Sequence, residues 1–258
     1  MLEKNRIENE LERLGITPPE IILYDITDST NTRAREYARK RSDSERKTVV
    51  FISNGQTAGR GRRGRSFVSE RGAGIYISIL TYPDESGADS TATTAWAAVS
   101  LSRAIESVCS CKIKIKWVND LYLGGKKLAG ILTEGETTVE GKIACQVVGM
   151  GINVYKNAIS DEISDIATSL EGETNDAPDR SILAARIIAE FLSERKDYYA
   201  EYKARSIVIG RDVTVVKLNE SYKSRVIDIN PDFSLTVERD GATERLFTGE
   251  ISLMVNCQ

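Results

Sequence analysis

The chain has 258 residues, of which 41% are hydrophobic and 28% are charged, and its formal net charge is −3. This length and composition predict a globular protein with one large domain, or one domain with a small appendix, and exclude collagen-like and disordered chains. The sequence contains no run of 18 apolar residues, and its charged N-terminus lacks the apolar core of a signal peptide. We therefore expect a cytoplasmic protein without a membrane span.

Histidine is absent from the sequence. This excludes Ser-His-Asp triads and histidine metal sites, so the chemistry must use Lys, Arg, Asp, Glu, Ser, Thr or Tyr side chains. The four cysteines, Cys109, Cys111, Cys145 and Cys257, match no zinc-ribbon or C-x-x-C spacing. We expect them to be reduced and structural, and we expect no metal site built by the protein alone.

Apolar periodicity predicts the secondary structure of the first two hundred residues in chain order. Helices are predicted over residues 2–14, 31–41 and 90–109, and the second of these follows the N-cap candidates Asp28, Ser29 and Thr30. A long helix is predicted to begin with Pro178 in its first turn and to end at about Lys203. Strands are predicted at residues 21–26, 48–53, 74–82, 112–118 and 145–154, with a hairpin over 121–134 that turns at Gly124 and Gly125.

The texture changes after Gly210, where short strand-like segments follow one another. The predicted strands are DVTVVKL, YKSRVIDI, FSLTVER and RLFTGEISLMV, separated by turns at residues 230–232 and 240–241. This pattern predicts a small all-β appendix.

The segment GRGRRGR, residues 59–65, is unusual in an acidic protein. Its glycines allow backbone N–H groups to converge on an anion, and its arginines are matched to phosphate and carboxylate groups. It formally fits the dinucleotide fingerprint G-x-G-x-x-G, but Gly72 and Gly74 break the helix that this motif requires. A disordered arginine-glycine RNA-binding segment is the other alternative. We favour a loop that wraps a polyanionic ligand.

Further segments resemble the biotin protein ligase family in composition and in order. With the loop NGQTAGRGRRGR at residues 54–65, they are Asp28-Ser29-Thr30-Asn31, Lys116-Trp117-Val118-Asn119-Asp120, KKLAGIL at residues 126–132, Gly149-Met150-Gly151-Ile152-Asn153 and Gly249-Glu250-Ile251-Ser252. Together they cover roughly residues 21–253. The chain therefore resembles a biotin protein ligase.

The resemblance implies a two-step reaction. Biotin and MgATP give biotinyl-5′-adenylate and pyrophosphate, and the activated carbonyl then passes to one lysine of a biotin carboxyl carrier protein. ATP, Mg²⁺ and biotin are the implied cofactors and substrates, and the carrier domain is the implied protein partner. DNA and membranes are not expected partners, and a homodimer stays open because relatives occur as monomers and dimers.

The resemblance assigns catalysis to Lys127 and Arg60. A lysine ammonium can stabilise the charge that develops on phosphate oxygens, and Arg60 and Arg62 would clamp the biotin carboxylate and the phosphate. The alternative for Lys127 is a solvent-facing hairpin lysine. The remaining residues matched to biotin binding are Ser29, Thr30, Asn31, Gln56, Gly59, Gly61 and Gly130, of which Ser29 and Thr30 also suit helix capping.

The residues matched to nucleotide binding are Arg62, Arg63, Phe67, Trp117, Asn119, Asp120 and Asn153. Asp120 is expected to place magnesium or adenine, or to form a turn. Trp117 is expected to form a pocket wall, or to pack in the core. Phe67 stands where related enzymes often carry Trp, and Val118 replaces the family's proline.

The implied fold is α+β: a class II synthetase-like mixed, largely antiparallel sheet with helices, followed by a small Src-homology-3-like β-barrel. We expect a catalytic domain at residues 1–205 and the barrel at residues 206–258. Only about twenty residues precede the first expected strand, too few for the DNA-binding domain of some relatives, so we expect a ligase without repressor function. A lipoate ligase and a non-enzymatic RNA-binding module are the alternatives.

Overall fold

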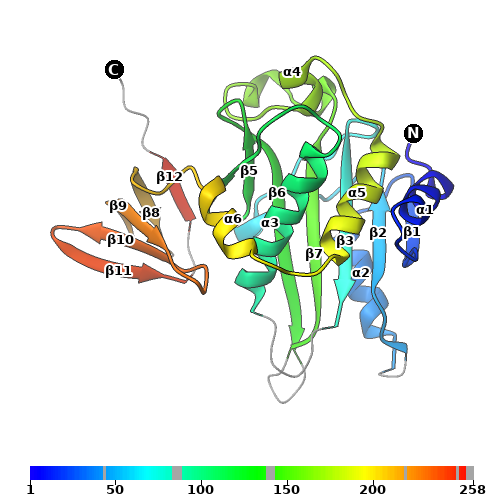
Figure 1. Cartoon of the computed structure of the whole chain (residues 1–258), viewed down its shortest axis with the longest axis horizontal. Helices are drawn as coiled ribbons and strands as arrows, with labels where there is room; N and C mark the ends of the chain where they lie inside the picture. The colour runs from blue at the N-terminus through cyan, green and yellow to red at the C-terminus, as the bar shows by residue number, and fades with distance from the viewer. Residues whose placement is uncertain (43–44, 83–88, 138–142, 218–219, 248–249, 254–258) are drawn as a thin grey trace.

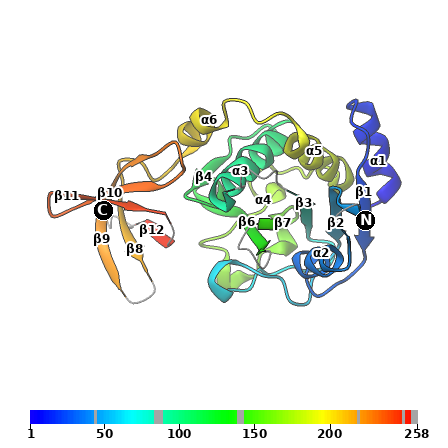
Figure 2. The ribbon, with the colours of Figure 1, turned by 90° about the horizontal axis from the view of Figure 1, so that it is seen from below.

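A seven-stranded sheet with helices on both faces forms the larger part of the protein (Figures 1 and 2). The computed structural model describes residues 1–42, 45–82, 89–137, 143–217, 220–247 and 250–253. The strands of this sheet are β1 (Glu20–Tyr24), β2 (Val49–Ser53), β3 (Gly74–Thr81), β4 (Lys114–Lys116), β5 (Asp120–Leu123), β6 (Lys126–Thr137) and β7 (Ile143–Asn153). Their order is β1-β2-β3-β7-β6-β5-β4.

The sheet is largely antiparallel, because only β1 and β2 pair in parallel among its neighbouring strands. The helices are α1 (Lys4–Arg13), α2 (Thr30–Arg39), α3 (Ser90–Glu106), α4 (Leu170–Thr174), α5 (Arg180–Leu192) and α6 (Tyr198–Arg205), with single 3₁₀ turns at Arg62–Gly64, Lys156–Ala158 and Asp161–Ile163. The predicted α+β class and the predicted hairpin at Gly124 and Gly125 are confirmed.

Alternation along the strands divides the core into two layers. Helices α3 and α5 cover one face of the sheet and α2 covers the other (Figure 2). In β2, Val50 and Ile52 belong to the large cluster beneath α3 and α5, whereas Val49 and Phe51 pack on the α2 side. Because side chains alternate across a strand, the same rule sends the even-numbered residues of β3 to the α2 side.

The long helix predicted from Pro178 to about Lys203 is wrong in two respects. Pro178 lies outside the helix, since Asp179 is the N-cap of α5 and its carboxylate accepts hydrogen bonds from two backbone N–H groups. The helix also ends at Leu192, and a second helix begins after Asp197, whose φ of 49° lies in the left-handed region. That backbone conformation cannot continue an α-helix, so the predicted element is two helices.

The C-terminal strands form a separate five-stranded antiparallel sheet. They are β8 (Asp212–Val216), β9 (Ser221–Ile229), β10 (Leu235–Arg239), β11 (Ala242–Leu246) and β12 (Glu250–Leu253), in the order β11-β10-β9-β8-β12. The predicted turns at residues 230–232 and 240–241 are confirmed, but the last predicted strand is two strands. In the described residues, β11 and β12 are edges and do not pair, so the sheet is open and the expected closed barrel is not formed.

The small sheet packs against α6, which itself lies against β4 of the larger sheet (Figure 1). Phe233 is buried among three tyrosines of α6, and its ring stacks on that of Tyr198 at a centroid distance of 5.3 Å. The carbonyl of Phe233 accepts a hydrogen bond from the indole N–H of Trp117 at 2.8 Å. None of the helices in the described part of the chain combines the length and apolar character that a membrane span requires.

Candidate active site

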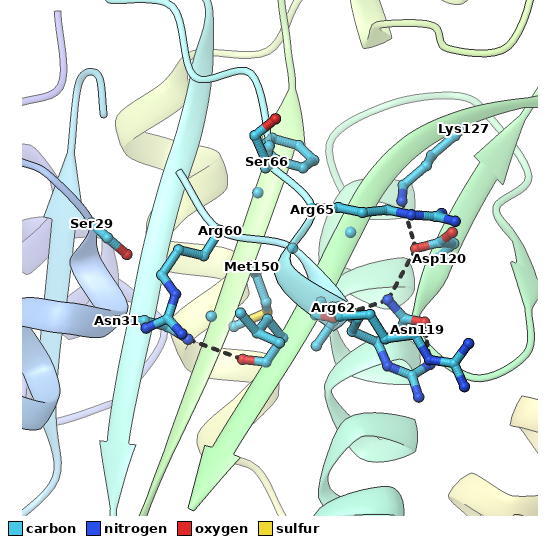
Figure 3. Close-up of a pocket in the computed structure, with 18 of the residues that line it drawn as sticks. Ser29, Asn31, Arg60, Arg62, Arg65, Ser66, Asn119, Asp120, Lys127 and Met150 are labelled. Carbon is cyan, nitrogen blue, oxygen red and sulfur yellow. Dashed lines mark hydrogen bonds and ion pairs between the residues drawn. The ribbon is translucent and has the colours of Figure 1, made fainter. Parts of the chain in front are cut away.

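The pocket that contains most of the predicted residues lies on the α2 side of the sheet (Figure 3). Its floor contains three glycines, which the strands β6 and β7 place in two rows that cross the sheet. Gly151 pairs with Tyr76 and Gly130, and Gly149 pairs with Ser78 and Leu132. A glycine leaves the backbone uncovered, so other groups can approach the sheet closely here.

Each glycine row receives one side chain. A Cβ at Gly151 would lie 2.6 Å from Cε1 of Phe67, and one at Gly149 would lie 2.2 Å from Oδ1 of Asn31. Phe67 also meets the edge of Tyr76, with 6.5 Å between ring centroids. The floor therefore holds an aromatic ring at one row and an amide at the other.

The glycine–arginine loop folds over this floor as a compact turn. Phe67 N donates to Gly59 O at 2.9 Å and Gly61 N donates to Arg65 O at 2.7 Å. A Cβ at Gly59 would lie 2.3 Å from the carbonyl oxygen of Phe67, so only glycine allows this approach. Arg63 has φ of 55°, a left-handed conformation that is unusual for a side-chain-bearing residue.

The loop arginines point to different partners (Figure 3). Arg60 reaches toward Asn31, and its Nη2 lies 3.1 Å from Oε1 of Glu134. Arg62 reaches the other side of the pocket and donates to Oδ1 of Asn119 at 2.9 Å. The guanidinium of Arg63 donates to the carbonyl of Val216 in the small sheet at 3.0 Å.

The β5–β6 hairpin adds a further cation to the pocket, the ammonium of Lys127, which is paired with the carboxylate of Asp120. Lys127 Nζ lies 2.7 Å from Asp120 Oδ1, and the same carboxylate oxygen accepts from Asn119 Nδ2 at 3.1 Å. Lys127 is thus directed into the pocket, unlike Lys126, whose ammonium donates to the carbonyl of Ser164. Both lysines are half-buried, and of the two Lys127 lines the pocket.

Polar groups gather at the opposite end, where α2 begins. Ser29 occupies the N-cap position, but its side chain makes no capping hydrogen bond. Gln56 Oε1 instead accepts from the backbone N–H of Thr30 at 2.8 Å, and its Nε2 donates to Ser69 Oγ at 3.0 Å. The hydroxyl of Ser29, with Thr30 and Asn31, is nearly buried and lines the pocket.

Fourteen of the sixteen predicted site residues line one pocket. They are Ser29, Thr30, Asn31, Gln56, Arg60, Gly61, Arg62, Arg63, Phe67, Trp117, Asn119, Asp120, Lys127 and Gly130. Gly59 does not line the pocket, but its missing side chain allows the close approach to the carbonyl oxygen of Phe67 within the loop. Asn153 is also outside the lining, since its amide donates to the carbonyl of Thr168 at 3.1 Å within the protein.

Sequence reasoning missed several residues at the site. Eight further lining residues lie inside the matched motifs, although the motifs assign them no role: Arg65, Lys116, Ile131, Leu132, Gly149, Met150, Gly151 and Ile251. Ser66 also lines the pocket and lies outside the motifs. Glu134 and Ser78 support the pocket from outside its lining. The sequence offers one signal for each of them. Glu134 is a charged residue two positions after Leu132 in β6, and Ser78 is a hydroxyl within the apolar run of β3.

The small sheet contributes to the pocket through Ile251 of β12 and through the position of Trp117. Gly249, in the matched GEIS segment, and Cys257 lie outside the described residues. The other three cysteines are free thiols, as expected. In the described chain, no group of three or more His, Cys, Asp or Glu side chains is arranged to hold a metal ion.

The site can therefore hold an anion that also carries uncharged polar groups. One end offers hydroxyl and amide groups in a buried setting, and the other offers guanidinium and ammonium groups. Burial, with a smaller contribution from the charge of Asp120, raises the pKa of Tyr122 to about 12, so the phenol whose ring lies 5.9 Å from Lys116 Nζ stays neutral. This arrangement suits a carboxylate that is brought against a phosphate.

The chain belongs to the biotin/lipoate A/B protein ligase family, whose model matches residues 23–153. This confirms the resemblance found in the sequence motifs.

Within that family, the relatives of this chain carry biotin ligase names. It is 35% identical over 190 residues to the biotin–[acetyl-CoA-carboxylase] ligase of Paracoccus denitrificans, covering 71% of this chain and 73% of that protein. It is 30% identical over 243 residues to the bifunctional ligase/repressor BirA of Bacillus subtilis, covering 90% and 74% respectively. Among solved structures, it is similar to the biotin protein ligase from Aquifex aeolicus in complex with biotin and ATP, with a TM-score of 0.74, 25% identity and coverage of 91% and 98%.

Proposed function

We propose that this chain is an ATP-dependent biotin protein ligase. It joins biotin to ATP as biotinyl-5′-adenylate and then transfers biotin to a lysine of a carrier protein. The observation that carries the proposal is that one pocket gathers the loop arginines, the hairpin lysine and the polar residues at the start of α2. Membership of the family and the biotin ligase names of its relatives support it.

In the first step, a carboxylate oxygen of biotin attacks the α-phosphorus of ATP. The bond from that phosphorus to the oxygen bridging the β-phosphate breaks, and pyrophosphate leaves. Two anions must approach each other, so the cations of Arg60, Arg62 and Lys127 lower the barrier by stabilising the charge on the phosphate oxygens. Lys127 exchanges Asp120 for the phosphate, while the loop arginines exchange Glu134 and Asn119 for ligand oxygens.

In the second step, the amine of the carrier lysine attacks the acyl carbon, the bond from that carbon to the AMP oxygen breaks, and AMP leaves. The amine loses a proton to solvent. Water must not reach the adenylate first, and the loop of residues 59–67 lies over the pocket floor where it can exclude water. We assign this closing role to the loop as part of the proposal.

Magnesium fits this site as a companion of the ATP phosphates. Mg²⁺ commonly binds one or two carboxylates together with substrate phosphates, and among the described lining residues Asp120 supplies a carboxylate beside Lys127. When bound, the ion neutralises phosphate charge. Asp120 would then hold magnesium and release the ammonium of Lys127 toward the α-phosphate.

Several finer assignments belong to this proposal. Phe67 and Trp117 bound the nucleotide half of the pocket, and Asn153, which bonds Thr168, would have to leave that bond to reach adenine. The division into residues 1–205 and 206–258 and a cytoplasmic location, where MgATP is abundant, are proposed with it.

Biotin-dependent exchange of pyrophosphate into ATP tests the proposal. We expect exchange with biotin and none with lipoate, followed by biotin transfer to a biotin carboxyl carrier domain. Exchange with lipoate alone would indicate a lipoate ligase. RNA binding with a steep salt dependence and no adenylate formation would indicate the non-enzymatic alternative.

A further inference from the structure

Ser78 is a fully buried hydroxyl beneath the polar end of the pocket. It lies in β3 on the α2 side of the sheet, in register with Gly149. Its Oγ is 2.6 Å from Oγ1 of Thr30 and 2.6 Å from Oδ1 of Asn31. It therefore touches two pocket residues without lining the pocket itself.

The amide of Asn31 has a fixed orientation. Its Nδ2 donates to the carbonyl of Leu132 at 3.2 Å and to Oε2 of Glu134 at 2.9 Å, and both partners are acceptors. The oxygen of the amide therefore faces Ser78 and brings no proton to that contact.

Counting protons then fixes the direction of the neighbouring hydrogen bonds. Ser78 has one proton and two close oxygen neighbours, and each contact of 2.6 Å between oxygens requires a proton. Asn31 Oδ1 can only accept, so the proton of Ser78 goes to Asn31. The proton of Thr30 must then go to Ser78.

Thr30 consequently presents lone pairs to the pocket. The two hydroxyls have two protons for three oxygen contacts, and the contact of 3.2 Å between Thr30 Oγ1 and Gln56 Oε1 is the longest, so it is the one left without a proton. Gln56 Oε1 still accepts from the backbone N–H of Thr30 at 2.8 Å. A hydroxyl whose proton is committed to a buried partner can accept a hydrogen bond from a ligand but cannot donate one.

We propose that Ser78 is a positioning residue that makes Thr30 an acceptor, and thereby selects a ligand whose ring carries an N–H donor. The inference rests on the proposed function and deepens it: the cyclic urea of biotin carries such N–H groups, and the dithiolane ring of lipoate carries none. A ligand without the donor would leave the lone pairs of Thr30 buried and unpaired.

The same hydrogen-bond chain reaches the catalytic end of the pocket. From Ser78 it passes through Asn31 to Glu134, whose other oxygen holds Arg60 at 3.1 Å. A ligand that displaces Glu134 from Arg60 leaves the Asn31 amide in place, because Glu134 uses a separate oxygen for each partner.

A double-mutant cycle measured by calorimetric titration with biotin tests the proposal. The variants are Ser78→Ala, Thr30→Val and the double variant, with Ser102→Ala as the matched control, because Ser102 is also fully buried but donates to Ala98 O in its own helix. We expect the Kd for biotin to rise about tenfold in Ser78→Ala and at least tenfold in Thr30→Val. A tenfold rise corresponds to the loss of about one hydrogen bond between the protein and the ligand. The double variant should resemble Thr30→Val within about twofold, because the proposal assigns the effect of Ser78 on the biotin ring to its contact with Thr30 and not to its contact with Asn31.

Kinetics supply a readout that a purely structural role would not move. In the exchange assay, Ser78→Ala should raise KM for biotin about tenfold and leave kcat within about twofold. If that variant does not fold, Ser78→Cys, which keeps the shape with a weaker donor, takes its place in the cycle.

The proposal would be overturned if the fold-changes in Kd of the two single variants multiply in the double variant. It would also be overturned if folded Ser78→Ala binds biotin with unchanged Kd. Neither result would affect the ligase function. A wild-type chain that does not bind biotin would overturn both.

Discussion

Lys127 and Asp120 meet across the β5–β6 hairpin with 2.7 Å between Nζ and Oδ1. The register of the two strands shifts between Leu121 and Tyr122, so Lys127 pairs with Tyr122 while its side chain reaches Asp120. The ammonium is therefore held in the pocket by a carboxylate before any ligand arrives. A ligand phosphate or a cation on Asp120 can release it.

Replacing Lys127 with alanine should separate binding from chemistry. We expect Lys127→Ala to bind biotin with nearly unchanged affinity and to form adenylate about 10²–10³-fold more slowly, because one charge-stabilising donor is lost. Single-turnover formation of biotinyl-5′-adenylate measures this. Lys126→Ala is the control, since that neighbouring ammonium bonds Ser164 O. Normal adenylation in Lys127→Ala would refute its catalytic role.

Arg60 should matter most for keeping the intermediate. In the structure its guanidinium links the loop to Glu134, and in the proposed complex it links the loop to the ligand. We expect Arg60→Ala to release biotinyl-5′-adenylate into solution at least about tenfold faster, the loss of one charge-assisted hydrogen bond. Filtration of labelled adenylate measures the release, and Arg71→Ala, which breaks an exposed pair with Asp25, serves as control. Equally tight retention in both variants would contradict a closing role for the loop.

A charge cluster between α3 and α6 predicts a pH-dependent contribution to stability. Arg205 donates to both Glu106 and Glu201 at 2.7–2.9 Å. Burial tends to raise the pKa of each carboxyl, but the hydrogen bonds and charges of Arg205 and, for Glu201, Arg103 outweigh it, so both pKa values are lowered. A lowered native pKa stabilises the protein above the unfolded value of about 4.3, and this contribution is lost as the pH falls through the native pKa values.

We therefore expect Arg205→Ala to lower the free energy of unfolding by about 2 kcal/mol at pH 7, and by much less at pH 3. Urea unfolding at the two pH values measures the difference. Arg225→Ala is the control, because its pair with Asp212 is exposed and 3.7 Å long, and it should change stability by less than about 0.5 kcal/mol. The same loss at both pH values would exclude this electrostatic origin.

The thiol of Cys111 should be unreactive in the folded protein. Burial, followed by the nearby Cys109 and Glu106, raises its pKa to about 11, so its thiolate fraction at pH 8 is on the order of 10⁻³. We expect iodoacetamide to modify it about a hundredfold more slowly than in the urea-unfolded chain. Peptide mass spectrometry over time follows the modification, and equal rates in the two states would contradict this environment.

Local signals in the sequence were sufficient for most elements and for most of the pocket. The Gly124-Gly125 pair predicts the hairpin because both residues take positive φ, at 57° and 83°. The matched motifs place fourteen of sixteen predicted residues in one pocket. By contrast, the break before α6 depends on the left-handed backbone of Asp197, and aspartate is also common where a helix begins. Apolar periodicity does not reveal this break, so it predicts one continuous helix.

Relationships between distant segments were not predictable from local patterns. Glu134 holds Arg60 from another strand, and Ser78 reads as a core residue of an apolar strand until Thr30 and Asn31 are placed above it. Closure of the small barrel likewise depends on whether the edges β11 and β12 meet, which strand patterns do not specify.

The most direct measurement is a crystal structure with biotin and a non-hydrolysable ATP analogue bound together. We expect the biotin ring beside Thr30 and its carboxylate between Arg60, Arg62 and the α-phosphate. Lys127 Nζ should lie within hydrogen-bond distance of a phosphate oxygen. Density for the two ligands away from the loop and from Lys127 would contradict this expectation.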